Sequence, residues 1–176
     1  MLSSRTKTLV AETDKFLAEP KALVGDPPSW EASTRDYEYQ AVWLVSDDLG
    51  AVKASLRFRV PKINWEYPSL SLVFANQQVY RVDIQPASKC EPNPPWASKL
   101  SLPPRVCGSH VHRWEDNRQH ILDTGLWSLP ARRPVEVSLR RIEQMLPWLC
   151  DQTLISLRPD QRNFDIPSKN DLFGLG

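Results

Sequence analysis

Residues 52–60 read Val-Lys-Ala-Ser-Leu-Arg-Phe-Arg-Val, which is the clearest structural pattern in the chain. Apolar side chains occupy every second position, and the positions between them are mostly basic and include Arg57 and Arg59. Successive side chains of a β-strand point to opposite faces of its sheet. The alternation therefore predicts a strand that packs one face against a core and presents a basic face on the other side.

The same two-residue period continues on both sides of this strand. Residues 39–45 precede it and run into a turn-like Asp-Asp-Leu-Gly, while residues 70–74 and 80–84 follow it, separated by a short Ala-Asn-Gln turn. Strands joined by short turns pair with their neighbours, so we expect an antiparallel meander. A fifth strand, which carries histidines, is predicted over residues 106–114, and the Glu115-Asp116-Asn117 that follows it is expected to form a turn.

The two ends of the chain have a helical period instead. Between residues 4 and 23, and again between residues 134 and 149, apolar side chains recur at spacings of three and four residues. We therefore predict an α+β fold, in which an antiparallel sheet of about five strands has an N-terminal and a C-terminal helix.

A proline-rich stretch lies between the fourth and fifth strands. Six prolines fall within residues 86–104, and proline has no N–H to donate to a sheet. We expect a long irregular loop here, of the kind that is often functional. The 176 residues fit a single domain. We assign this domain to residues 1–157 and expect residues 158–176, which contain few apolar side chains, to form a flexible C-terminal tail.

The overall composition argues against several classes of protein. With 22 Lys and Arg against 21 Asp and Glu, the formal charge is only +1, so nucleic acid would need a local basic patch. No apolar run approaches the roughly 20 residues that a membrane span needs, and the N-terminus lacks the apolar core of a secretion signal. Three cysteines do not suggest a disulfide framework. We therefore expect a cytoplasmic protein with no membrane partner.

Residues that can carry chemistry are clustered. All three histidines fall within residues 110–120, downstream of Cys90 and Cys107. Alternate residues of a strand share a face, so His110 and His112 are expected to reach one centre with Cys107. Cys90 is expected to join them across the proline-rich loop. Zinc favours thiolate and imidazole ligands in a tetrahedron. One hypothesis is therefore a zinc site of these four residues, which stabilises a non-enzymatic protein.

The hypothesis that we rank first uses the same imidazoles without a metal. Cleavage of RNA by its own 2′-hydroxyl needs a base, an acid and a cation near the phosphorus, and no cofactor. His110 and His112 would exchange protons with the 2′- and 5′-oxygens. If the histidine strand lies beside the fourth strand, Arg81 would stabilise the developing charge and Asp83 would orient one imidazole. Phosphate contacts would come from three further arginines, which are Arg57, Arg59 and Arg113.

A purely structural interpretation of these residues stays open. Histidines on a strand often bond only to the backbone or to carboxylates. Arg81 and Asp83 can form an exposed ion pair of little energetic value. Charged strand faces such as the one that carries Arg57 and Arg59 are more often solvated than bound to nucleic acid.

Two motifs resemble those of a family of short uncharacterised bacterial and phage proteins. They read Tyr80-Arg81-Val82-Asp83-Ile84 and Cys107-Gly108-Ser109-His110-Val111-His112, with a proline- and asparagine-rich loop between them. The family pattern is an R-x-D-I strand, an H-x-N-P loop and a C-P-H-x-H strand before a C-terminal helix. Here Cys90 stands where the family has its loop histidine, and a metal site tolerates this replacement better than acid–base catalysis does.

The resemblance implies no function by itself. Small proteins with an H-x-H strand also resemble RNase toxins of toxin–antitoxin pairs, which is an analogy of fold. We therefore expect an RNA-cleaving, toxin-like protein with RNA as its substrate or an antitoxin as its partner. The alternative is a zinc-stabilised interaction or inhibitor protein that acts on a host or defence complex.

Overall fold

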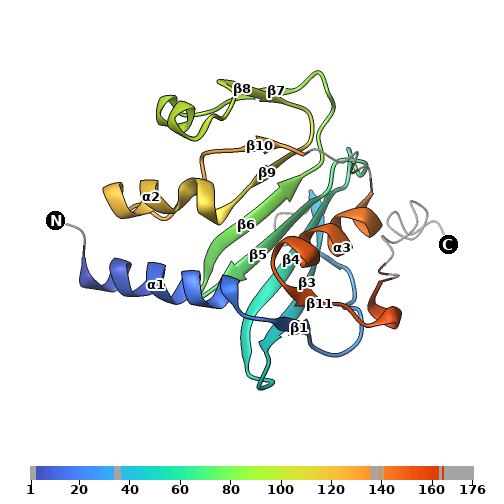
Figure 1. Cartoon of the computed structure of the whole chain (residues 1–176). Coiled ribbons are helices and arrows are strands. Elements are labelled where there is room, and N and C mark those ends of the chain that lie inside the picture. The colour runs from blue at the N-terminus through green and yellow to red at the C-terminus, as the bar shows by residue number, and fades with distance from the viewer. Residues whose placement is uncertain (1–2, 34–36, 136–138, 140, 163, 165–176) are drawn as a thin grey trace.

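The computed structural model describes residues 3–33, 37–135, 139, 141–162 and 164 (Figure 1). In these residues one sheet contains nine strands, which are β1 (Lys21–Leu23), β2 (Glu31–Ala32), β3 (Glu38–Asp47), β4 (Val52–Pro61), β5 (Ser69–Phe74), β6 (Gln77–Asp83), β9 (His110–His112), β10 (Arg133–Pro134) and β11 (Ile155–Ser156). Their order is β10-β9-β6-β5-β4-β3-β1-β11, with β2 beside β3. Only β1 and β11 are parallel.

The α+β class and the antiparallel meander from β3 to β6 confirm the sequence-based expectation. The sheet is larger than the expected five strands because short strands extend it on both sides. Strands β1, β2, β10 and β11 have only two or three residues each, which is too few to show a two-residue period.

Three α-helices accompany the sheet in the described residues: α1 (Ser4–Ala18), α2 (Trp114–Thr124) and α3 (Ile142–Gln152). Helix α1 confirms the predicted N-terminal helix, but it ends at Ala18 and residues 21–23 form β1 instead. The side chain of Ser3 caps its first turn by accepting a hydrogen bond from the N–H of Thr6. Helix α2 replaces the turn expected after the histidine strand. Helix α3 starts later than predicted, because Pro134 pairs in β10 rather than opening a helix.

The two faces of the sheet differ in character. One face carries cross-strand rows of apolar residues, such as Trp43, Leu56, Leu72 and Tyr80, and these side chains are buried. Side chains of helices α1 and α3 pack against this face, and α3 lies in front of the strands in Figure 1. The stacking of Phe16 on Phe74, with ring centroids 4.4 Å apart, fixes α1 there. The opposite face is free of these helices.

The proline-rich stretch forms an ordered arm, which we define as residues 86–107. It contains β7 (Cys90–Pro92), the 3-10 helix η1 (Pro95–Leu100) and β8 (Arg105–Cys107). Strands β7 and β8 pair with each other in a separate two-stranded sheet. The predicted fifth strand is therefore divided, because β8 belongs to the arm and β9 belongs to the main sheet.

The first residues of the predicted tail pack against the rest of the chain. The 3-10 helix η2 (Pro159–Gln161) follows the predicted domain boundary at residue 157, and Gln161 and Phe164 are buried. The ring of Phe164 stacks on Trp30 with centroids 5.3 Å apart. The remainder of the predicted tail, residues 163 and 165–176, lies outside the described residues. In the described part of the chain, no helix combines the length and the apolar character needed to cross a bilayer.

Candidate functional site

The pairing of β6 with β9 assembles the candidate site. Arg81 lies opposite His112 and Asp83 lies opposite His110, with Val82 opposite Val111 between them. Val82 and Val111 are fully buried, and because side chains alternate along a strand, the polar residues project from the other face. The structure thus brings together the four residues expected to perform catalysis, on the face away from α1 and α3.

The basic positions of β4 project from this same face. Arg59 pairs with Ser69, which pairs with Asp83, and one position further Arg57 pairs with Ser71. Both arginines are exposed. The face therefore carries a row that runs from Arg59 to His110 and a neighbouring row that runs from Arg57 to His112.

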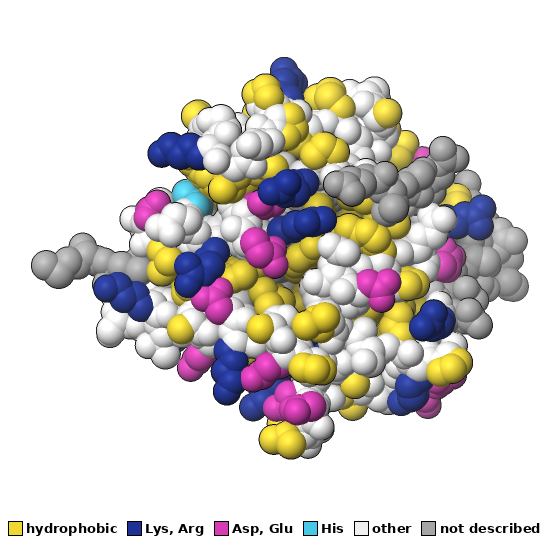
Figure 2. Space-filling view, viewed as in Figure 1, with side chains coloured by type: hydrophobic (Ala, Val, Ile, Leu, Met, Phe, Trp, Pro, Cys, Tyr) yellow, Lys and Arg dark blue, Asp and Glu magenta, His cyan; other side chains and the backbone are white. Residues whose placement is uncertain are grey.

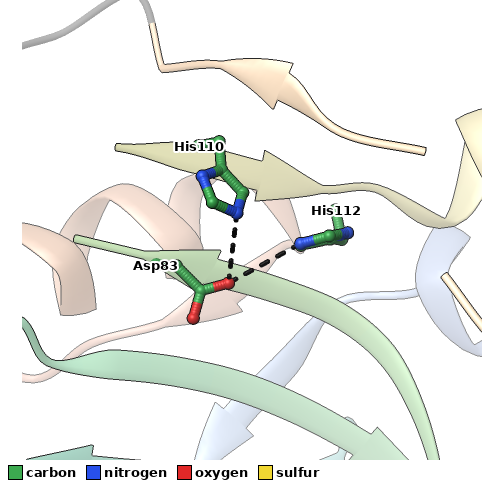
Figure 3. Close-up of side chains that lie close together, drawn as sticks. All are labelled: Asp83, His110 and His112. Carbon is green, nitrogen blue, oxygen red and sulfur yellow. Dashed lines mark ion pairs between the residues drawn. The ribbon is translucent and has the colours of Figure 1, made fainter. Parts of the chain in front are cut away.

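Asp83, His110 and His112 form a buried triad (Figure 3). Oδ2 of Asp83 lies 3.7 Å from Nε2 of His110 and 3.6 Å from Nε2 of His112. The exposed fractions are 4%, 2% and 8% respectively, so little water competes with ligands here. At these separations the carboxylate and imidazoles face one another without a direct hydrogen bond.

Each member of the triad is held by a further group. Nδ1 of His110 lies 2.9 Å from the carbonyl oxygen of Gly108, and Nδ1 of His112 lies 2.6 Å from that of Leu129. A carbonyl only accepts hydrogen bonds, so both Nδ1 atoms are the donors. In a neutral imidazole this tautomer leaves the lone pair on Nε2, which faces Asp83.

Arg81 holds the carboxylate, and burial sets the charge of one imidazole. The guanidinium donates from Nε and Nη2 to Oδ1 of Asp83, at 2.9 and 2.7 Å. This leaves Oδ2 as the oxygen that faces the histidines. Burial lowers the pKa of His112 to about 4, although Asp83 acts in the opposite direction. The imidazole of His112 is therefore neutral at pH 7.

Two buried asparagines fix the cover over His112, which we define as residues 129–132. Asn117 donates to the carbonyl of Ala131 and accepts from its N–H, at 3.1 and 2.7 Å. Asn93, from the arm, donates to the carbonyl of Arg132 and accepts from its N–H, both at 2.9 Å. The cover is thus tied to α2 and to the arm.

An ion pair joins the arm to the cover as well. Nη1 of Arg132 contacts Oε2 of Glu91. Burial acts to raise the pKa of Glu91, but Lys89 and Arg132 together hold it below its ordinary value. Sequence patterns gave no signal for Asn93, Asn117, Glu91 or Arg132, because their partners lie far away in the chain.

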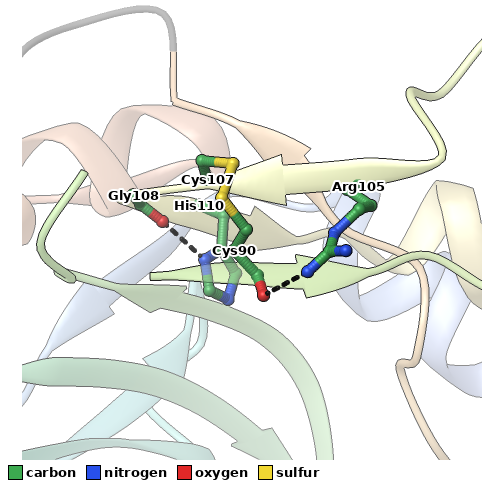
Figure 4. The surroundings of a disulfide bond; sticks show 5 residues. All are labelled: Cys90, Arg105, Cys107, Gly108 and His110. Atoms are coloured by element: carbon green, nitrogen blue, oxygen red, sulfur yellow. Dashed lines mark hydrogen bonds between the residues drawn. A yellow bond between two sulfur atoms is a disulfide. The ribbon is translucent and has the colours of Figure 1, made fainter. Parts of the chain in front are cut away.

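The two cysteines predicted as zinc ligands form a disulfide (Figure 4). The antiparallel register of β7 and β8 places Cys90 directly opposite Cys107. A sulfur in a disulfide is not a thiolate and does not ligate zinc. The predicted four-ligand set of Cys90, Cys107, His110 and His112 is therefore corrected, as is the expectation of no disulfide. The third cysteine, Cys150, is free and buried.

The structure offers a different metal-binding set. One oxygen of Asp83 and one nitrogen each of His110 and His112 all lie within 4.8 Å of one another. Ligand atoms about 2.1 Å from a tetrahedral ion are about 3.4 Å apart. The observed separations of 3.6 and 3.7 Å between carboxylate and imidazoles are close to this value.

Arg113, which was expected to contact phosphate, and the third clustered histidine, His120, lie away from the triad. Arg113 follows His112, on the side of the sheet where it interacts electrostatically with the buried hydroxyl of Tyr80. It does not lie in the rows of Arg57 and Arg59. His120 is in α2 and stacks on Trp96 with ring centroids 5.0 Å apart. Only two of the three clustered histidines therefore belong to the site.

A cavity of about 390 Å³ adjoins the triad at Asp83. We call it the Arg59 pocket, and six of its lining residues are Arg59, Tyr67, Arg81, Asp83, Gln85 and Lys89. Three of these are cations. By contrast, the face that α1 and α3 cover shows acidic and basic side chains interspersed with apolar ones (Figure 2).

Comparisons with protein-family models, with curated proteins and with solved structures gave no match. The resemblance to uncharacterised bacterial and phage proteins stays a prediction from the two motifs. Arguments about function therefore rest on the geometry and chemistry of the site.

Proposed function

We propose that the protein is a metal-dependent hydrolase, in which Asp83, His110 and His112 bind one divalent transition metal ion. The observation that carries this proposal is the orientation of the three donor atoms. One ligand atom of each residue lies within 4.8 Å of the others, and both imidazole Nε2 atoms lie 3.6–3.7 Å from Oδ2 of Asp83. The remaining polar atoms of these side chains are engaged by Gly108, Leu129 and Arg81.

Such outer partners are typical of metal centres. A ligating histidine commonly donates its other N–H to a carbonyl or carboxylate, which fixes both its tautomer and the direction of its lone pair. Both histidines of the triad have this arrangement. Both lone pairs are thereby directed at one carboxylate oxygen. This arrangement is repulsive unless a cation lies between these atoms.

The number of ligands favours a catalytic role over a structural one. Structural zinc sites usually have four protein ligands, whereas catalytic sites keep one position for water. The triad supplies three. A bound ion lowers the pKa of its water and so supplies a nucleophile near neutral pH. Two-histidine, one-carboxylate sets suit zinc and also iron(II), so both metals belong in the test.

RNA cleavage without a metal is the second candidate function. It is favoured by the common sheet face of Arg57, Arg59 and Arg81, next to His110 and His112. In this proposal the imidazoles transfer protons, Arg81 stabilises charge, and RNA is the substrate. A toxin-like role with an antitoxin partner in the cytoplasm belongs to this candidate. A non-enzymatic inhibitor of a host complex, with the metal as a structural element, is the remaining alternative.

Metal analysis separates these candidates. Chelator-treated protein is dialysed against Zn²⁺, Fe²⁺ or Mn²⁺ and measured by mass spectrometry. We expect about one ion per chain in the wild type. In Asp83→Asn and His112→Ala the affinity should fall by more than about 100-fold, because the loss of a ligand exceeds the 10- to 100-fold loss that is typical of an outer partner. His120→Ala is the matched control, because His120 lies outside the triad. Wild-type protein that retains none of the three metals would overturn the proposal.

Activity assays complete the test. Hydrolysis of p-nitrophenyl phosphate, p-nitrophenyl acetate and single-stranded RNA is measured with and without chelator. Loss of hydrolysis with chelator and its return with metal support the metal-dependent enzyme. Cleavage of RNA that persists in chelator supports the second candidate. Bound metal that raises stability without any hydrolysis contradicts both enzymes and favours the structural role.

A further inference from the structure

We propose that the Arg59 pocket binds a phosphate ester whose alcohol part carries hydroxyl groups, as in a sugar phosphate or a ribonucleotide. The proposal deepens the function above, because it rests on the triad as the reactive centre and names its class of substrate. Asp83 is the link, since it belongs to the triad and also lines the pocket.

The position of the pocket on the sheet supports this assignment. Arg59, Ser69, Asp83 and His110 lie in one cross-strand row, and neighbouring strands are about 4.8 Å apart. The first three of these residues line the pocket. A ligand held by Arg59 therefore lies on the same face as the triad. A small organic molecule bound there is long enough to reach Asp83.

The charges of the pocket favour an anion. Arg59, Arg81 and Lys89 face it together with two acids, Glu38 and Asp83. Arg59 is 3.9 Å from Glu38, which is longer than a hydrogen bond, and its side chain is 53% exposed. The guanidinium thus has donors for an oxyanion, and its planar fork suits phosphate.

Lys89 places a further cation at the pocket. It comes from the arm, and its ammonium is 3.2 Å from Glu91 with its side chain 54% exposed. An ammonium has three donors, so this contact leaves it able to bind a further oxygen. A guanidinium from the sheet and an ammonium from the arm therefore face the pocket from separate elements.

Gln85 provides an observation that points to a hydroxyl group. Its Oε1 is buried and accepts no hydrogen bond from any residue that the structure describes. A buried acceptor without a donor is unfavourable. Phosphate at neutral pH has few protons to donate, whereas a sugar hydroxyl is a donor. The residue lines the Arg59 pocket and also a neighbouring cavity. A turn of its side chain toward the Arg59 pocket would let Oε1 accept a hydrogen bond from a hydroxyl group of the ester.

Ligand titrations monitored by NMR test the proposal, on protein with measured metal content. The probes are inorganic phosphate, methyl phosphate, ribose 5-phosphate and a short single-stranded RNA. We expect Arg59→Gln to weaken the binding of ribose 5-phosphate roughly tenfold, as expected for the loss of a charge-assisted hydrogen bond. Arg57→Gln is the matched control. It removes the same side chain from the same strand and face, outside the pocket.

Gln85→Met tests the hydroxyl separately. Wild-type protein should prefer ribose 5-phosphate to methyl phosphate, and the variant should lose most of this preference while binding methyl phosphate as before. Tight binding of RNA with weak binding of ribose 5-phosphate would identify a polynucleotide as the source of the ester. Equal effects of the Arg57 and Arg59 substitutions, or no binding of any phosphate probe, would overturn the inference.

The two proposals fail in different ways. If metal binds to the triad but no phosphate ester binds to the wild type, the inference about the substrate is wrong and the metal site stands. If phosphate esters bind in an Arg59-dependent manner but the triad retains no metal, the hydrolase proposal is wrong and the pocket stands as a binding site.

Discussion

Arg81 and Asp83 lie two residues apart on β6, and the guanidinium of Arg81 donates two hydrogen bonds to a single oxygen of Asp83, at 2.9 and 2.7 Å. The two oxygens of the carboxylate therefore have different partners. Oδ1 is engaged by Arg81, and Oδ2 faces the two histidines. In the metal-bound state that we propose, Arg81 is a positioning residue that restricts Asp83 to one ligating oxygen.

Replacing Arg81 should therefore weaken metal binding without removing a ligand. We expect Arg81→Met to lower the affinity of the triad for Zn²⁺ by roughly 10- to 100-fold, the range typical of lost outer partners. Competition with a chromophoric chelator measures this affinity. The control is Arg57→Gln, which leaves the triad untouched. An Arg81→Met protein with wild-type affinity would show that the orientation of Asp83 does not depend on Arg81.

Removing Asn117 should loosen the cover over His112. Asn117→Ala leaves the buried N–H and carbonyl of Ala131 without their partner, and unsatisfied groups of this kind cost about 1–3 kcal/mol each. We expect a loss of about 3 kcal/mol in the free energy of unfolding, measured with urea. Gln119→Ala, on an exposed part of α2, should change stability by less than about 0.5 kcal/mol. Similar effects of both substitutions would contradict the role of Asn117.

Reduction of the disulfide should lower thermal stability. Cys90 and Cys107 are 17 residues apart, and closing a loop of this size stabilises a protein by about 3 kcal/mol. For a chain of this length the corresponding fall in Tm is roughly 6–12 °C, and calorimetry with and without reductant measures it. The double variant Cys90→Ser, Cys107→Ser lacks the bridge, so its Tm should equal that of the reduced wild type both with and without reductant. An unchanged Tm of wild-type protein in reductant would mean that the bridge adds no stability.

Lys21 should make stability depend on alkaline pH. Burial lowers its pKa to about 8, against an ordinary value of 10.5. Between these two pH values the unfolded chain binds more protons than the folded one, so the free energy of unfolding rises with pH in this window. Lys21→Met should remove that part of the rise, as measured by urea unfolding at several pH values.

Lys15→Met is the control for the pH experiment. Lys15 lies on α1, six residues before Lys21, and its side chain is 77% exposed. Its replacement should leave the slope between pH 8 and 10.5 as it is in the wild type. If Lys21→Met and the wild type show the same slope, burial does not lower the pKa of Lys21.

The long elements of the fold could be predicted from the sequence because each carries many repeats of its pattern. Strand β4 alternates over ten residues, and α1 shows its apolar stripe over 15. Helix α2 was missed because it contains few apolar residues, and its opening Glu115 and Asp116 are as typical of a turn as of a first helical turn. The start of α3 was misplaced because proline is also common in the first turn of a helix.

The candidate site could be predicted only as far as local spacing reaches. The alternation in β6 and β9 placed Arg81 with Asp83 and His110 with His112, and the pairing of these strands joined the two pairs. The Cys90–Cys107 bridge depends on the register of two three-residue strands, which no periodic pattern reveals. The cover and its asparagines depend on tertiary contacts between distant segments.

The pairing of β6 with β9 has a consequence for how the chain folds. Strands β3 to β6 are joined in sequence and can assemble from local contacts, whereas β9 must first span the whole arm before it docks. Asp83 comes from β6, and His110 and His112 come from β9. A metal ion that binds only the completed sheet would shift the equilibrium toward the docked state by mass action. The ion would then stabilise the junction between β6 and β9, and its uptake would report that β9 has docked on the meander.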